Sequence, residues 1–183
     1  NDLATQYATD PLFYYARLKQ GNLLRSMNNF AGAQIVYENL INGFPTHEMR
    51  YVAELSRADC MLALAGNDSD GLADAIVILE RLLDLPNLPL DFQAEAAQKW
   101  AFALIKSGSS EKAKEVLWLS ADRFIRDGGR AAALGAPGRY WLARSMLQLV
   151  EIFEKQDNLV EARKIYRQVI AYNLPGRHIA ISR

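Results

Sequence analysis

The residues of this 183-residue chain that could carry nucleophilic or metal chemistry are few and far apart. We expect His47 and Cys60 on one helix, where thirteen intervening steps of 1.5 Å separate them by about 20 Å. A nucleophile and its general base need contact near 3 Å, so these two do not form a pair. His178 stands alone near the C-terminal end. This arrangement predicts no catalytic residue, no metal site and no internal disulfide.

Two segments imitate ligand-binding motifs without the required context. Residues 67–71 (NDSDG) alternate oxygen-bearing side chains, but the glycine and glutamate of a calcium loop do not follow at their positions. A turn that caps the next helix is favoured there. The glycines of residues 127–139 resemble a phosphate loop, yet no Gly-Lys-Ser/Thr sequence follows and no strand precedes them. We therefore expect a flexible basic loop, either functional or a spacer, and no cofactor.

The chain also contains glutamate pairs and tryptophans at helical spacing. The glutamates have lysines beside them, which favours solvated helix faces over acid–base chemistry. The tryptophans are expected to be packing anchors in the core rather than stacking platforms for bases. These residues are Glu111, Glu115, Glu151, Glu154, Trp100, Trp118 and Trp141.

The overall composition is balanced, but the charge is unevenly distributed. The 21 basic and 21 acidic residues cancel, which argues against nucleic-acid partners, and no apolar run is long enough to span a membrane. Residues 1–91 carry 6 Lys/Arg and 12 Asp/Glu, a net charge of −6, and residues 92–183 carry 15 and 9, a net charge of +6. The two halves could associate head to tail between molecules, or they could simply be differently composed solvated surfaces.

The hydrophobic pattern is helical almost throughout and predicts an all-α protein. Eight helices are expected, two of them within residues 14–45. The others lie near residues 47–65, 72–84, 92–106, 110–126, 139–155 and 159–172. Each second helix of a pair starts with a small residue that is followed by large apolar residues at helical spacing. These small residues are Ala33, Ala75, Ala113 and Ala162.

Residues 13–45 carry the clearest repeat signature, with Gly21, Leu24, Ala33, Tyr37 and Pro45 at the characteristic positions. Most of this signature recurs between Met146 and Tyr166. The chain therefore resembles the tetratricopeptide repeat family, whose period is 34 residues. The spacings of 42, 38 and 49 residues between successive alanines exceed that period, and the surplus falls in turns.

The resemblance implies an α-solenoid of about four helix hairpins wound into a right-handed superhelix. The expected repeats are residues 12–46, 47–90, 91–127 and 139–175, with a loop at 128–138. Pro11 lies one period before Pro45, so residues 1–11 are interpreted as the tail of an upstream repeat and the chain as part of a longer protein.

In this family the first helices line a concave groove that binds protein segments. The resemblance implies a lining that suits an amphipathic helix or an extended peptide with apolar anchors and some acidic character. Asn22 matches the carboxylate clamp of chaperone-binding relatives, but Leu18, Ser56 and Glu95 depart from it, so recognition of a C-terminal carboxylate is not expected. The expected lining residues are Tyr15, Leu18, Asn22, Arg25, Val52, Leu55, Asp59, Leu62, Glu95, Gln98, Phe102, Ile105, Arg144, Leu147, Glu151 and Lys155.

A finer resemblance concerns the compartment. Residues 37–45 and 53–66 are similar to the bacterial envelope branch of the family, which includes outer-membrane assembly lipoproteins and periplasmic coordinators of division. The resemblance favours a periplasmic or envelope location, with the cytoplasm as the alternative. The predicted function is a non-catalytic protein-binding scaffold. The alternative is a regulatory or targeting appendage of an enzyme whose catalytic domain lies outside residues 1–183.

Overall fold

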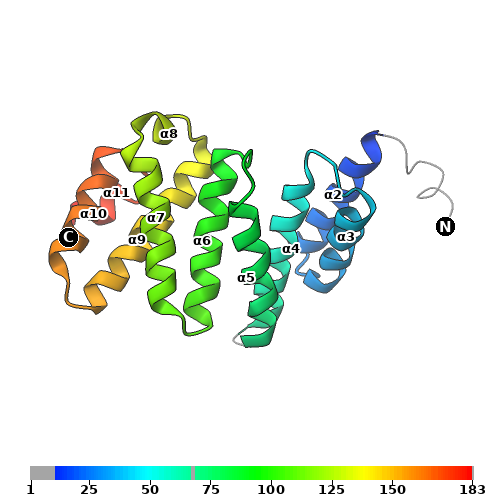
Figure 1. Ribbon diagram of the computed structural model, residues 1–183, viewed down its shortest axis with the longest axis horizontal. Coiled ribbons are helices and arrows are strands. Elements are labelled where there is room, and N and C mark those ends of the chain that lie inside the picture. The colour runs from blue at the N-terminus through cyan, green and yellow to red at the C-terminus, as the bar shows by residue number, and fades with distance from the viewer. Residues whose placement is uncertain (1–10, 67–68, 183) are drawn as a thin grey trace. The chain divides into compact units, whose positions relative to one another are not determined.

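The computed structural model describes residues 11–66 and 69–182, and these residues form ten α-helices and no strand (Figure 1). The expected all-α class is confirmed. The helices are α2 (Pro11–Ser26), α3 (Phe30–Gly43), α4 (Arg50–Ala65), α5 (Ser69–Leu83), α6 (Leu90–Lys106), α7 (Ser110–Arg126), α8 (Gly128–Ala132), α9 (Ala136–Lys155), α10 (Leu159–Ala171) and α11 (Arg177–Ile181). The chain divides into two compact units, one ending at Ile78 and one beginning at Leu79.

Three helix hairpins share one turn geometry, which is direct structural evidence of a repeat. The turns are Asn28–Asn29, Gly108–Ser109 and Asp157–Asn158, and the first residue of each has a positive φ of 59°, 84° and 56°. Glycine, asparagine and aspartate adopt this left-handed conformation most readily. The backbone N–H of each second residue donates to a carbonyl five positions earlier, at 2.8–2.9 Å. The chain therefore reverses in the same way in α2–α3, α6–α7 and α9–α10.

The core of the first unit forms where α2, α3 and α4 pack together. Tyr37 is fully buried and lies over Gly21, where a Cβ atom would come within 2.5 Å of the tyrosine ring. Tyr14 stacks on His47 with ring centroids 3.6 Å apart, and its hydroxyl donates to the Met49 carbonyl at 3.1 Å. His47 precedes α4 rather than lying within it, so its expected place on one helix with Cys60 is wrong. Cys60 is fully buried, as expected of a small core residue.

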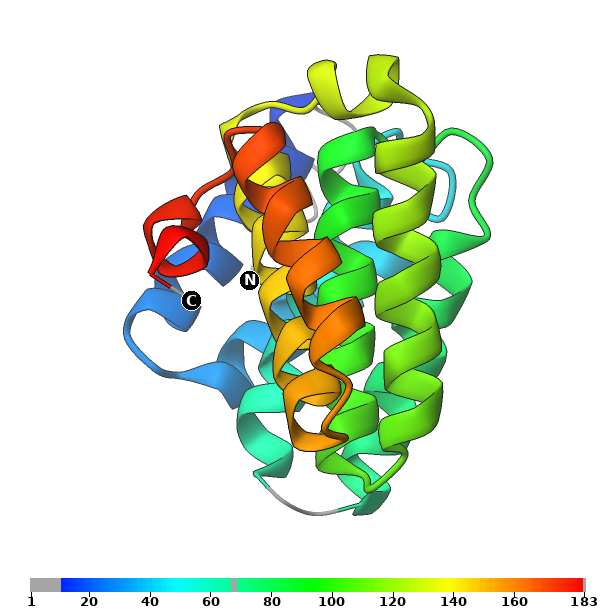
Figure 2. The ribbon, with the colours of Figure 1, turned by 90° about the vertical axis from the view of Figure 1, so that its left-hand side faces the viewer.

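In the second unit α6 packs against α7 and α9, and α9 packs against α7 and α10. Figure 2 shows these four helices running alongside one another. Ala113 and Ala162, which begin the second helix of their hairpins, are buried as the small-residue pattern predicts. Close approach of two helices requires small side chains at such positions.

The expected loop at residues 128–138 is largely wrong. The Asp127 side chain accepts a hydrogen bond from the Gly129 N–H at 3.1 Å and caps α8, and α9 already begins at Ala136 with Pro137 in its first turn. Proline suits this position because the first N–H groups of a helix have no intrahelical acceptor. The Asp91 side chain also accepts from the Gly135 N–H at 2.9 Å. The segment is thus folded onto the start of α6.

Three expectations for single residues also need correction. Ala131, expected in an irregular loop, is 3% exposed within α8. Trp118, expected in the core, is 43% exposed, and its ring packs edge-on against Phe153 of α9. Arg139, expected in a free basic loop, donates to the carbonyls of Tyr172 and Asn173 at 2.8 and 2.9 Å. Of the expected tail at residues 1–11, Pro11 is the first residue of α2 and residues 1–10 lie outside the described residues, as do Asn67 and Asp68 at the start of the calcium-like segment.

Candidate functional site

The polar groove residues expected in the first unit are engaged within that unit. Arg25 and Asp59 form an ion pair at 2.7 Å that joins α2 to α4. The Tyr37 hydroxyl donates to the side-chain oxygen of Asn22 at 2.7 Å. The Tyr15 hydroxyl donates to the carboxylate of Glu48 at 3.1 Å. These polar groups have partners on other helices and turns of the same unit, so the ion pair and the two hydrogen bonds join its elements.

The apolar groove residues expected in the first unit are mostly core residues. Leu18 packs in the cluster around Tyr14 and Tyr37, and Leu55 and Leu62 are buried as well. Val52 is half-buried against the same cluster. Burial leaves these leucines little surface for direct contact with a ligand, and in this structure they belong to the core of the first unit.

The groove residues expected in the second unit behave differently, because five of them line one hollow of about 440 Å³. This hollow, which we call the α6–α9 hollow, lies between the walls formed by α6 and α9. Its lining comprises the expected residues Gln98, Phe102, Arg144, Leu147 and Glu151, together with Tyr140, Ala143, Gln148, Pro175 and Gly176.

Helical spacing places these side chains on facing surfaces. Gln98 and Phe102 are four residues apart on α6, and Arg144, Leu147 and Glu151 follow one face of α9 at steps of three and four. The turn after α10 closes one end of the hollow. Arg139 of α9 donates hydrogen bonds to the carbonyls of Tyr172 and Asn173 in this turn. Gly176 has a φ of 83°, and a Cβ atom there would lie 2.9 Å from a Leu147 methyl group. A glycine is therefore required at that end of the hollow.

A glutamine pair forms the polar floor of the α6–α9 hollow. Gln98 is only 3% exposed, and its Nε2 donates to Oε1 of Gln148 at 3.1 Å. Each side-chain amide offers one acceptor oxygen and two donor hydrogens. This single bond uses the oxygen of the half-buried Gln148 and leaves its Nε2 able to donate to a carbonyl group of a ligand.

An aromatic and cationic cluster lies at one rim. Arg144 is exposed and donates to the Tyr140 hydroxyl at 3.2 Å. The Trp141 ring has Arg144 at 5.8 Å from its centroid and Lys99 at 5.1 Å. Cation–π contacts of this kind orient a guanidinium without neutralising its charge. At the other rim Glu151 is exposed.

Comparison with known families identifies two of the hairpins. A model described as tetratricopeptide repeat matches residues 15–47 and residues 140–173. Both hairpins match the tetratricopeptide repeat. These segments contain most of α2–α3 and α9–α10, so the second one supplies one wall of the α6–α9 hollow. The matches support the tetratricopeptide repeat (TPR) family for this chain. Such repeats generally serve as protein–protein interaction modules, which supports a scaffold role. No curated protein matches the chain.

Some lining residues were missed by the TPR register, and some expected ones lie elsewhere. Tyr140 and Gln148 lie one turn on either side of Arg144, so the helical pattern could have included them. Pro175 and Gly176 carried no such signal, since they follow α10 and reach the site only through the fold. Outside the lining are Ile105, Lys155 and Glu95, and Glu95 pairs with Lys99.

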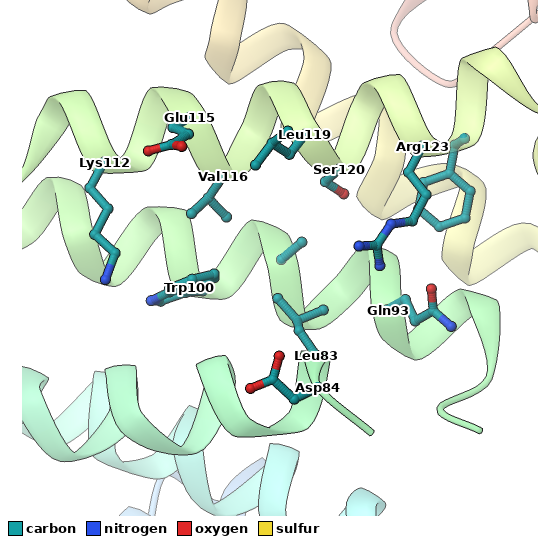
Figure 3. Close-up of a pocket in the computed structure, with 12 residues that line it drawn as sticks. Leu83, Asp84, Gln93, Trp100, Lys112, Glu115, Val116, Leu119, Ser120 and Arg123 are labelled. Carbon is teal, nitrogen blue, oxygen red and sulfur yellow. The ribbon is translucent and has the colours of Figure 1, made fainter. Parts of the chain in front are cut away.

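A second hollow of about 290 Å³ lies on the α7 side of the second unit (Figure 3). Figure 3 shows Val116, Leu119 and Arg123 of α7 on one side, with Trp100 of α6 drawn between α7 and the end of α5. Leu83 and Asp84 at the end of α5 lie opposite α7. The Trp100 indole nitrogen is buried without a hydrogen-bond partner. This hollow lacks the paired amides of the α6–α9 hollow, and none of the expected groove residues line it.

In the part of the chain that the structure describes, no three His, Cys, Asp or Glu side chains gather into a group that could hold a metal ion. Across the same residues, no helix is both long and apolar enough to cross a membrane.

Proposed function

We propose that this chain is a non-catalytic scaffold that binds a segment of a partner protein in the α6–α9 hollow. One observation carries the proposal: the expected residues Gln98, Phe102, Arg144, Leu147 and Glu151 converge on a single hollow. The TPR matches support this use, because the repeats of this family present their first helices to protein ligands.

Phe102 and Leu147 provide the apolar contacts of the proposed site. They face the hollow from opposite walls, and both are partly exposed. Lys106 lies 5.2 Å from the centroid of the Phe102 ring and adds positive charge beside it. Truncating a central aromatic side chain typically costs more binding energy than any rim contact. We therefore expect apolar anchors to dominate affinity, while charge governs the association rate and salt dependence.

The test is selection of a phage-displayed library of random dodecapeptides on the full chain. We expect clones whose binding falls at least about tenfold with Phe102→Ala, in line with loss of a buried aromatic contact. Leu119→Ala is the matched control, because Leu119 lines the second hollow and not the α6–α9 hollow. Clones that bind the wild-type chain and the Phe102→Ala variant equally would refute the proposal.

We also propose a bacterial envelope location, which is supported by the resemblance of residues 37–45 and 53–66 to that branch of the family. Fractionation of the native cells with an antibody against the chain tests this location. Recovery in the envelope or periplasmic fraction is expected, and recovery with cytoplasmic markers would contradict it.

A further inference from the structure

The α6–α9 hollow is lined by two charged side chains of opposite sign, Arg144 and Glu151. Both are exposed, and among the residues that the structure describes neither forms an ion pair. The hydrogen bond from Arg144 goes to the neutral hydroxyl of Tyr140. A positive and a negative charge are thus both available to a ligand.

The two charges are ordered along α9. Arg144 and Glu151 are separated by seven residues, which is two helical turns or about 10.5 Å. Leu147 lies between them on the same face, and Phe102 faces the hollow from α6. A ligand that lies along α9 therefore meets a cation, an apolar contact and an anion in sequence.

The half-buried amide of Gln148 favours an extended ligand over a helical one. A helix satisfies its own backbone N–H and C=O groups, whereas an extended chain has them free. The Gln148 Nε2 can donate a hydrogen bond to a carbonyl of such a backbone.

We propose that the hollow binds an extended segment that carries an acidic and a basic side chain three positions apart, with an apolar residue between them. An extended polyproline-like chain rises about 3.1 Å per residue and places every third residue on the same side, so two side chains three positions apart span about 9 Å and can both face α9. The acidic side chain pairs with Arg144 and the basic one pairs with Glu151. The apolar residue between them is turned away from α9 and contacts Phe102 on the α6 wall. The proposal rests on the proposed function.

The experiment repeats the selection with the same dodecapeptide library on the wild-type chain, on Arg144→Glu and on Glu151→Arg. Wild-type clones should carry one acidic and one basic residue three positions apart. Arg144→Glu should select two basic residues at that spacing, and Glu151→Arg should select two acidic ones. Each variant should bind the wild-type peptide on the order of tenfold more weakly, because a pair of opposite charges becomes a like-charge pair.

The control variants are Arg163→Glu and Glu115→Arg, which make the same changes at exposed positions outside the hollow. Both should select the wild-type pattern, and thermal unfolding confirms that all four variants are folded. If clones depend on Phe102 but their charge pattern is unchanged in Arg144→Glu and Glu151→Arg, this inference is overturned and the proposed function stands. If no clone depends on Phe102, both are overturned.

Discussion

At the scale of single residues, the contact between Gly21 and Tyr37 tests the TPR register most directly. An alanine Cβ atom at position 21 would lie 2.5 Å from the ring of Tyr37, which is buried and hydrogen-bonded to Asn22. Overpacking of this kind costs about 1–3 kcal/mol, which exceeds the gain of roughly 1 kcal/mol from replacing a helical glycine with alanine. We expect Gly21→Ala to lower the free energy of unfolding by about 1–2 kcal/mol in urea titrations.

Gly43→Ala is the matched control, because a Cβ atom there would have no neighbour within 4 Å. That variant should be neutral or slightly stabilising. The double change Gly21→Ala with Tyr37→Leu should recover part of the loss relative to the sum of the single changes, since removing the ring removes the clash. If the losses of unfolding free energy from the two single changes simply add in the double variant, the explanation by a clash between residues 21 and 37 is wrong.

The hydroxyl of Tyr14 makes stability depend on alkaline pH. Burial, reinforced by the negative charge of Glu54, raises the pKa of Tyr14 from 10.0 to about 12. Between these values the unfolded chain loses its proton while the folded chain keeps it, so stability is full below pH 10 and falls as the pH rises toward 12. Urea midpoints measured from pH 8 to pH 12 should therefore decline less steeply for Tyr14→Phe than for the wild-type chain. Identical slopes would show that Tyr14 does not contribute.

At the scale of elements, the short helix α8 is the part of the fold that the hydrophobic periodicity of the sequence did not predict. The longer helices follow from apolar spacing and polar turns, and Asn29 and Asn158 cap α3 and α10 as such residues usually do. Residues 128–138 have no apolar period, and their structure depends on Asp91 and on burial of Ala131 beside α7. These contacts come from distant positions, so glycine content alone suggested a free loop.

Because Ala131 is buried in α8, enlarging its side chain should destabilise the protein, whereas the same change in a free loop would have little effect. Ala131→Leu should destabilise the protein by about 1–3 kcal/mol through overpacking, as should Ala33→Leu and Ala162→Leu at the hairpin seams. All three alanines are buried. Ala132→Leu, in the same helix but exposed, should leave the melting temperature nearly unchanged. Equal melting temperatures for Ala131→Leu and Ala132→Leu would show that α8 does not pack as described.

At the scale of the whole molecule, the sequence predicted the helix pairs well, while the use of the groove residues as a binding site stays a prediction. Phe102 and Arg144 line one hollow because α6 and α9 each present a regular face to it. The register could not show that Arg25 and Asp59 neutralise each other. These residues are 34 positions apart in the sequence, and they form an ion pair only because α2 and α4 fold into the same unit. Which expected groove residues remain available is therefore a tertiary property.

The opposite charges of the two halves are the last feature that can be tested on the whole molecule. Three acidic residues of the first half form ion pairs within it, in the pairs Glu38–Arg57, Glu54–Arg50 and Asp59–Arg25, and the half keeps its net charge of −6. An ion pair between exposed side chains contributes only about 0–1 kcal/mol and is screened by salt, so charge alone does not hold two molecules together. We expect the sedimentation coefficient to be the same at low and high salt. Association at low salt that is abolished by Arg163→Glu with Arg167→Glu would instead support head-to-tail docking.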